Sequence, residues 1–311
     1  MSQFQILSAS IGDISIRYPW MIAAGILGTS ASLMKRLARC NIGAVITKSV
    51  GLTPRSGYSN PTVIGLPDDL NGSILNAVGL SNPGVKEFSS EIIETKYCDV
   101  PIIASIFGEN ASELSEVALA LENTPISGFE INLSCPHSGK YGLALGTHPG
   151  TVFQVVAAIK DSTRKPVWAK LSPNVTDIVS IGKAAEEGGA DAVVAINTLQ
   201  AVAVDIWAKK LVLSHGVGGL SGACLRPVAL RCVKQLYESL EIPVIGVGGI
   251  TSWQNVVEFL LVGASAVQIG SALSNCNLES FFRSLAQGFK EYLKNEGISR
   301  PNDLVGMALG S

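Results

Sequence analysis

Charged residues are scarce in this sequence of 311 residues, at 15% of the total, and neither sign dominates. The 23 basic and 25 acidic side chains give a formal net charge of −2. This balance provides no basic surface for a phosphate polymer, so we expect no nucleic-acid partner. Hydrophobic residues reach 47%, which is enough for a large core and argues against disorder.

Export, membrane and metal signals are also lacking. The first residues do not combine a charged segment with an apolar run, as a secretory signal does. The apolar stretch 259–273 is broken by Gly263, Gln268 and Gly270, which favours a helix, a turn and a strand over a membrane span. The six cysteines are scattered without a C-x-x-C pair, so no disulfide scaffold, zinc site or iron–sulfur cluster is expected. We therefore expect a cytoplasmic protein with reduced thiols and no metal.

Eight short apolar runs are typical of parallel strands covered on both faces. Helical patterns with apolar residues three and four positions apart separate them. Eight strands alternating with helices predict a (β/α)8 TIM barrel formed by one domain, residues 1–311. A doubly wound open sheet is the alternative, but it usually has fewer strands. The predicted strands comprise residues 20–25, 43–49, 100–108, 128–135, 166–173, 191–198, 243–250 and 266–273.

Two connections are too long for a simple loop and helix. Residues 50–99 follow the second strand, and residues 199–242 follow the sixth. Both inserts are expected to rise from the C-terminal mouth of the barrel, where barrel enzymes hold their active sites. Residues 4–7 and 14–17 predict a small β-hairpin that closes the opposite end.

Glycine-rich turns follow the last two strands. Gly248 and Gly249 follow strand seven, and Gly270 and Ser271 follow strand eight. Such turns present bare backbone N–H groups, and TIM barrels hold phosphate groups at this place. We therefore prefer a phosphate site to the alternative that these glycines only make tight turns.

Cys135 is the only cysteine at a strand end in the predicted mouth, and its neighbours Asn132, Ser134 and His137 are polar. A thiolate there can serve as a general base or a nucleophile, whereas a buried inert thiol is the alternative. His215, in the second insert, is interpreted as a structural or surface residue.

Lys48 and Lys170 end otherwise apolar strands. Lysine is rarely buried without a partner, and Glu130 is a candidate for a structural ion pair. The functional alternatives are an anion anchor, an electrostatic stabiliser or a Schiff-base nucleophile. Two lysines at equivalent depth favour a function.

Three amides, Asn76, Asn132 and Asn197, are expected to converge on the mouth. An amide side chain offers both a donor and an acceptor, so several can recognise a planar ring that carries C=O and N–H groups. Any one of them alone is more often a turn residue.

Together these strings resemble the dihydroorotate dehydrogenase family along nearly the whole chain. Cys135 is similar to class 1, in which cysteine is the base. The Gly-Gly-Leu-Ser-Gly string at 218–222 and the Asp205-Ile206 pair are similar to class 1B. The resemblance is carried by Thr47-Lys48-Ser49, Asn132-Leu-Ser-Cys-Pro136, Lys170-Leu-Ser-Pro173, Ala195-Ile-Asn-Thr198, Gly246-Val-Gly-Gly249, Gln268-Ile-Gly-Ser271 and residues 76–84.

The resemblance implies FMN-dependent oxidation of dihydroorotate to orotate in pyrimidine (UMP) biosynthesis. Cys135 would remove the C5 proton while hydride passes from C6 to flavin N5, and Lys170 would stabilise the reduced flavin. The implied FMN site comprises Ala24, Lys48, Ser49, Ser105, Asn132, Lys170, Ile196, Gly222, Gly248, Gly249, Gly270 and Ser271. The implied substrate site comprises Lys48, Asn76, Ala77, Val78, Gly79, Leu80, Asn132, Asn197 and Thr198.

The class 1B resemblance also implies a partner subunit that carries FAD and a 2Fe–2S cluster, in a heterotetramer of two catalytic and two electron-transfer subunits. No G-x-G-x-x-G string follows a strand in this sequence, so we expect that this chain alone does not reduce NAD efficiently.

Departures from the family pattern leave alternatives open. His137 stands where many members have Asn, and Cys-Pro-His also occurs in the related dihydropyrimidine dehydrogenase barrel. An FMN-dependent oxidoreductase of that kind is the main alternative. Residues 208–210 and Ala223 depart from the pattern on the side of the partner. A Schiff-base lyase that uses Lys170 and a non-catalytic phosphate-binding barrel are further alternatives.

Overall fold

The computed structural model describes residues 7–67, 70, 72–134 and 145–310. Eight parallel strands close into a barrel in the order β3-β4-β7-β8-β9-β10-β15-β16, which confirms the predicted TIM barrel. Each strand overlaps its predicted range. The barrel strands are β3 (Trp20–Ile22), β4 (Val45–Ile46), β7 (Ile102–Ile106), β8 (Gly128–Asn132), β9 (Val167–Leu171), β10 (Ala192–Ala195), β15 (Val244–Val247) and β16 (Ala264–Ile269).

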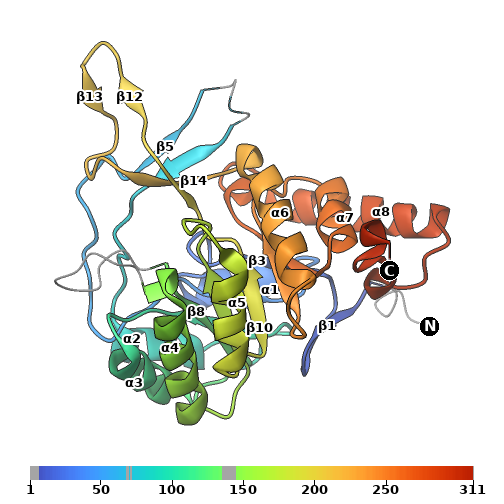
Figure 1. Cartoon of the computed structure of the whole chain (residues 1–311), viewed down its shortest axis with the longest axis horizontal. Coiled ribbons are helices and arrows are strands. Elements are labelled where there is room, and N and C mark those ends of the chain that lie inside the picture. The colour runs from blue at the N-terminus through green and yellow to red at the C-terminus, as the bar shows by residue number, and fades with distance from the viewer. Residues whose placement is uncertain (1–6, 68–69, 71, 135–144, 311) are drawn as a thin grey trace.

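Helices pack around the outside of the barrel (Figure 1). Asn110 caps one of them as its sequence position predicts, since its Oδ1 accepts the Glu113 N–H at 3.0 Å. Pro227 lies in the first turn of another, also as predicted. In the described part of the chain no helix combines the length and apolarity that crossing a bilayer requires. The helices are α1 (Ala31–Ala38), α2 (Val85–Ile93), α3 (Ala111–Leu121), α4 (Pro149–Ser162), α5 (Ile178–Glu187), α6 (Arg226–Tyr237), α7 (Trp253–Leu261) and α8 (Leu278–Asn295).

Alternation along each strand explains why these runs form a barrel. On β9, Val167, Ala169 and Leu171 belong to the large core between strands and helices. Trp168 and Lys170, at the intervening positions, face the barrel interior, because side chains alternate between the two faces of a strand. Both faces are buried, which is why the strand reads as an almost continuous apolar run.

A hairpin of β1 (Ala9–Ile11) and β2 (Ile14–Ile16) closes the lower end of the barrel. The prediction was right for the second strand and wrong for the first. The tight turn at Gly12 and Asp13 pairs Ile11 with Ile14, so the partner of β2 is residues 9–11. Leu7 lies outside β1, and residues 4–6 lie outside the described part of the chain.

The two long inserts combine into one antiparallel sheet in the order β11-β14-β6-β5, which lies above the barrel in Figure 1. The first insert provides β5 (Val63–Gly65) and β6 (Ile74–Asn76), and the second provides β11 (Leu199–Ala201) and β14 (Gly218–Ser221). Both inserts therefore rise from the mouth, as predicted.

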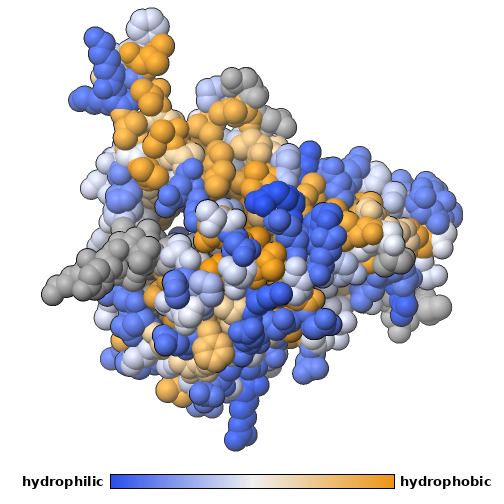
Figure 2. Space-filling view, viewed as in Figure 1, coloured by the Kyte–Doolittle hydropathy of each residue, from blue (hydrophilic) through white to orange (hydrophobic). Residues whose placement is uncertain are grey.

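A second hairpin, β12 (Val204–Asp205) and β13 (Lys210–Leu211), projects beyond this sheet. Its tip exposes Ile206 and Trp207, the latter at 89% of its surface, and Figure 2 shows apolar residues along its flank. Apolar side chains exposed in such a projection are typical of an interaction surface.

Candidate active site

A cavity of about 700 Å³ lies between the mouth of the barrel and the insert sheet. Its volume falls within the range of about 300–1,000 Å³ that is usual for ligand and cofactor sites. Residues from seven of the eight strand ends and from both inserts line it, so sites far apart in the sequence meet here. The predicted site residues on its wall are Ala24, Lys48, Ser49, Asn76, Ala77, Val78, Gly79, Leu80, Asn132, Lys170, Ile196, Asn197, Thr198, Gly222, Gly248, Gly249, Gly270 and Ser271.

Ser105 takes a different place from that expected of a cofactor contact. It is fully buried and does not line this cavity; its Oγ lies 2.9 Å from Ser49 Oγ, and its backbone N–H donates to Thr47 Oγ1 at 3.0 Å. Ser105 thus supports Ser49 from behind. Cys135 and His137 lie outside the described residues.

A glycine cradle forms where the turn after β15 meets the end of the insert sheet. Gly222, Gly248 and Gly249 all have positive φ angles, of 112°, 138° and 67°. A Cβ atom on Gly249 would lie 2.7 Å from the Gly222 carbonyl oxygen, and one on Gly222 would lie 2.6 Å from Ser73 Cα. Any side chain there would displace backbone, so only glycine permits this close approach.

Amide side chains meet on the cavity wall as predicted. Asn197 Nδ2 donates to Asn132 Oδ1 at 3.2 Å, and Asn76 Nδ2 donates to the Gly219 carbonyl at 3.2 Å. Asn132 Oδ1 also accepts the Ser134 N–H at 3.1 Å. These bonds fix the orientation of the amides, and each keeps unused donor or acceptor capacity for a ligand. Ser134 Oγ is buried and has no hydrogen-bond partner in the described part of the chain.

Lys170 forms the buried ion pair with Glu130 that the sequence suggested, with Nζ 3.3 Å from Glu130 Oε1. Both residues also line the cavity, so Lys170 is at the same time a member of an ion pair and a residue of the site. Gln268 completes the group, since its Oε1 accepts a hydrogen bond from Lys170 Nζ at 3.1 Å.

Lys48 faces the same cavity, and the described residues provide no counter-ion for it. Burial lowers the pKa of its ammonium group, and no carboxylate among the described residues lies within ion-pair distance. A half-buried cation without a protein partner is unfavourable unless a ligand supplies the negative charge. The Lys48 side chain therefore suits an anionic ligand.

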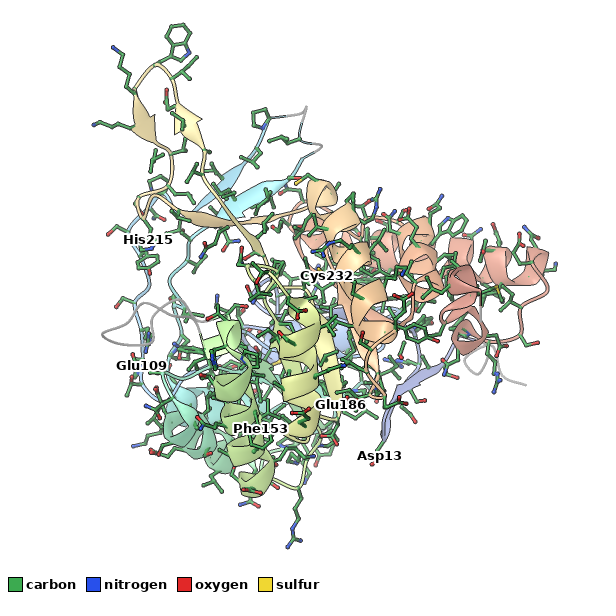
Figure 3. All side chains as sticks on the ribbon, viewed as in Figure 1. Asp13, Glu109, Phe153, Glu186, His215 and Cys232 are labelled. Carbon is green, nitrogen blue, oxygen red and sulfur yellow. The ribbon has the colours of Figure 1, made fainter. Side chains whose placement is uncertain are left out.

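Sequence patterns did not reveal part of the wall. Tyr58 and His215 stack with ring centroids 3.9 Å apart and an interplanar angle of 8°, and both line the cavity. His215 is exposed, as expected, and it lies below the strands of the insert sheet (Figure 3). Because Tyr58 belongs to the first insert and His215 to the second, their stacking connects the two inserts. No local motif signals this pair, because it exists only once the inserts fold together.

Asn174 was also missed. It donates from Nδ2 to the Thr198 carbonyl at 3.0 Å and accepts the Gln200 N–H at 2.8 Å, so it ties the turn after β9 to the second insert. Its position just after Ser172-Pro173 at a strand end was the available signal.

Comparison with known proteins agrees with this architecture. The family model described as dihydroorotate dehydrogenase matches residues 6–293. The chain is 48% identical over 308 residues to the "Dihydroorotate dehydrogenase B (NAD(+)), catalytic subunit" of Pyrococcus horikoshii, covering 98% of both chains. It is 45% identical over 304 residues to the protein of the same name from Methanosarcina mazei, covering 97% of this chain and 95% of the relative.

A solved structure of DHODH from Eimeria tenella in complex with ferulenol has the same fold, with a TM-score of 0.86 over 100% of this chain and 91% of the other, at 19% identity. The family match spans most of the sequence, and the high-identity relatives are catalytic subunits of the B type. This chain accordingly belongs to the dihydroorotate dehydrogenase family of oxidoreductases, in class 1B.

Proposed function

We propose that this protein oxidises dihydroorotate to orotate with FMN as its cofactor, in pyrimidine biosynthesis. The observation that carries the proposal is the single cavity wall on which a glycine cradle, a row of amides and two lysines occur together. The cradle suits a phosphate, the amides suit a pyrimidine ring, and Lys48 suits a carboxylate.

The described residues fit FMN. Gly248, Gly249 and Gly270 offer backbone N–H groups to its phosphate, at positions where a side chain on Gly249 would meet backbone. The buried Ser134 hydroxyl, which has no hydrogen-bond partner among the described residues, marks polar capacity on the same wall. Bound FMN would supply the two-electron acceptor for the hydride that leaves substrate C6.

The chain's own residues then have separate tasks. Lys48 holds the carboxylate of dihydroorotate, while Asn76, Asn132 and Asn197 orient its ring through its C=O and N–H groups. Cys135 takes the proton from C5. The insert sheet covers the mouth and limits access of water.

The lysine at position 48 also separates dihydroorotate from the alternative substrates. Dihydropyrimidine bases carry no carboxylate, so they offer no negative charge to the half-buried ammonium of Lys48, which has no counter-ion among the described residues. Dihydroorotate supplies that negative charge. The charge of Lys48 therefore favours dihydroorotate oxidation over a dihydropyrimidine dehydrogenase-like activity.

Anaerobic mixing of the purified yellow protein with dihydroorotate or dihydrouracil tests the proposal. We expect dihydroorotate to bleach the flavin absorbance and dihydrouracil to leave it nearly unchanged. A protein that cannot be loaded with FMN, or one that dihydrouracil reduces equally well, would overturn the assignment.

We further propose that a subunit with FAD and a 2Fe–2S cluster passes the electrons to NAD, in a heterotetramer of two catalytic and two electron-transfer subunits. The relatives are named catalytic subunits, and the exposed Ile206 and Trp207 offer apolar surface for assembly. Native mass measurement of the protein from its own source tests this. Robust NAD reduction by the isolated chain would contradict it.

A further inference from the structure

Three polar side chains form a closed hydrogen-bonded ring across the inside of the barrel. Lys170 Nζ donates to Glu130 Oε1 at 3.3 Å and to Gln268 Oε1 at 3.1 Å, and Gln268 Nε2 donates to Glu130 Oε2 at 2.6 Å. We call Glu130, Lys170 and Gln268 the floor ring. Each member is hydrogen-bonded to the other two.

The floor ring spans the full width of the barrel. Glu130 is on β8 and Gln268 is on β16, and three strands separate β8 from β16 in either direction around the barrel. Lys170 is on β9, beside β8. Side chains from opposite walls thus meet near the barrel axis.

The order of donors and acceptors in the floor ring allows one arrangement. The ammonium of Lys170 only donates, the carboxylate of Glu130 only accepts, and the amide of Gln268 does one of each. A flipped amide would place its NH₂ group against the ammonium. The Gln268 amide therefore fixes where the Lys170 ammonium lies relative to the carboxylate.

The floor ring separates an apolar layer from the cavity. Below it, Met21, Ile103 and Trp168 belong to the cluster that the lower hairpin seals. Above it, all three members line the cavity. The described residues accept two of the three N–H bonds of Lys170, so a third donor is available to a ligand at the cavity floor.

Stability alone is a weak reason for this arrangement. Glu130 and Gln268 are 0% exposed and Lys170 is 5% exposed. Removing two charges from water costs nearly as much as their pairing returns, and well-packed apolar residues are often as stable. Met21 and Ile103 in the layer below are fully buried and apolar, so an apolar replacement would meet apolar side chains on that side.

We propose that Glu130 and Gln268 are positioning residues that hold the Lys170 ammonium at the cavity floor and thereby set the reduction potential of the bound flavin. The inference rests on the proposed FMN site. A fixed positive charge favours the reduced flavin, which carries more negative charge, and the effect depends on how close that charge is held. The hydrogen bond to Gln268 Oε1 opposes the attraction of Lys170 Nζ to Glu130 and so keeps the ammonium from moving closer to the carboxylate.

The variant Gln268→Met tests the inference, because it keeps the side-chain volume and removes both bonds of the amide. We expect the two-electron equilibrium of bound FMN to shift toward the oxidised form by about tenfold, equivalent to about 30 mV. Sulfite, which adds to oxidised flavins and places negative charge on the ring, should bind about tenfold more weakly. Both quantities are measured by spectral titration without substrate turnover.

Ile103→Val is the matched control, since it trims a fully buried residue of the layer just below the floor ring. It should lower the melting temperature and leave the flavin potential unchanged. If Gln268→Met does not fold, Gln268→Asn shortens the amide by one methylene and should shift the equilibrium in the same direction.

The outcomes separate this inference from the proposed function. Wild-type potential and sulfite affinity in a folded, FMN-loaded Gln268 variant would overturn the positioning role while leaving the dihydroorotate dehydrogenase assignment intact. A wild-type protein that does not take up FMN would overturn the proposed function itself.

Discussion

The two ends of the barrel are built from the same strands and differ in almost every chemical respect. At the lower end, Ile11, Ile14, Met21 and Ile103 pack into a sealed apolar cluster under the β1–β2 hairpin. At the upper end, Glu130, Asn132, Lys170 and Gln268 line an open cavity. Figure 3 places Asp13, in the lower hairpin turn, far from His215 beneath the insert sheet.

This contrast shows how one barrel separates stability from chemistry. The inward residue of β9 changes from Trp168 to Lys170 within two positions, so a single strand serves both ends. Substitutions at the upper end should alter ligand binding more than folding, and substitutions at the lower end should do the reverse.

The largest effect is expected from Cys135→Ala at the upper end. Loss of a general base should slow flavin reduction by dihydroorotate by about 10²- to 10⁴-fold, while FMN stays bound. Stopped-flow absorbance under anaerobic conditions measures this rate. Cys98→Ala is the control: this half-buried thiol precedes the N-terminal end of β7 and does not line the cavity, so the variant should reduce at the normal rate. Unchanged kinetics in Cys135→Ala would remove that residue from the mechanism.

Gly249→Ala should weaken FMN binding by about 100-fold. The added Cβ would lie 2.7 Å from the Gly222 carbonyl oxygen, so the turn must open and lose charge-assisted N–H contacts to the phosphate. Fluorescence titration of apoprotein with FMN gives the dissociation constant. Gly297→Ala is closely matched, because Gly297 has a φ of 69° and nothing within 4 Å of the added Cβ. Equal FMN affinity in both variants would refute the cradle.

Lys48→Met should weaken orotate binding by about 30-fold, which corresponds to one charge-assisted bond of about 2 kcal/mol. Burial lowers the pKa of Lys48, so the wild-type ammonium is lost at a lower pH than is usual for lysine. Orotate affinity should therefore be fully present below that lowered pKa and fall as the pH rises through it. Orotate binding titrations over the alkaline pH range test this. If the affinity of Lys48→Met still falls with rising pH, the pH dependence belongs to another group.

Ile245→Val, in the apolar cluster of the lower end, should have the smallest effect. Removing one methylene from this fully buried residue should lower the free energy of unfolding by about 0.5–1.5 kcal/mol. Chemical denaturation measures that loss. The dissociation constant for FMN should stay at its wild-type value, and a change there would mean that the two ends are not independent.

The sequence predicts the mouth well, because the barrel topology itself brings strand ends together. Once eight strands are recognised, Gly249, Lys170 and Asn197 must all face one opening. Asn132 and Asn197 then contact each other although 65 residues separate them.

Other features depend on how deep a side chain lies in the barrel and on contacts between distant segments, and a sequence pattern contains neither. Ser105 is fully buried on β7 and contacts Ser49 Oγ, so Ser49 and not Ser105 lines the cavity. Tyr58 stacks on His215 only after both inserts have folded together. Gln268 closes the floor ring only after the barrel has brought β16 opposite β8. The first strand of the lower hairpin was predicted at residues 4–7 and lies at residues 9–11. The turn at Gly12, and not the local hydrophobicity, sets its register.

The most direct test of the account is a crystal structure of this protein with FMN and orotate bound. We predict the FMN phosphate on the backbone N–H groups of Gly248, Gly249 and Gly270, and the orotate carboxylate about 3 Å from Lys48 Nζ. A flavin bound outside the barrel mouth, or orotate bound away from Lys48, would contradict it.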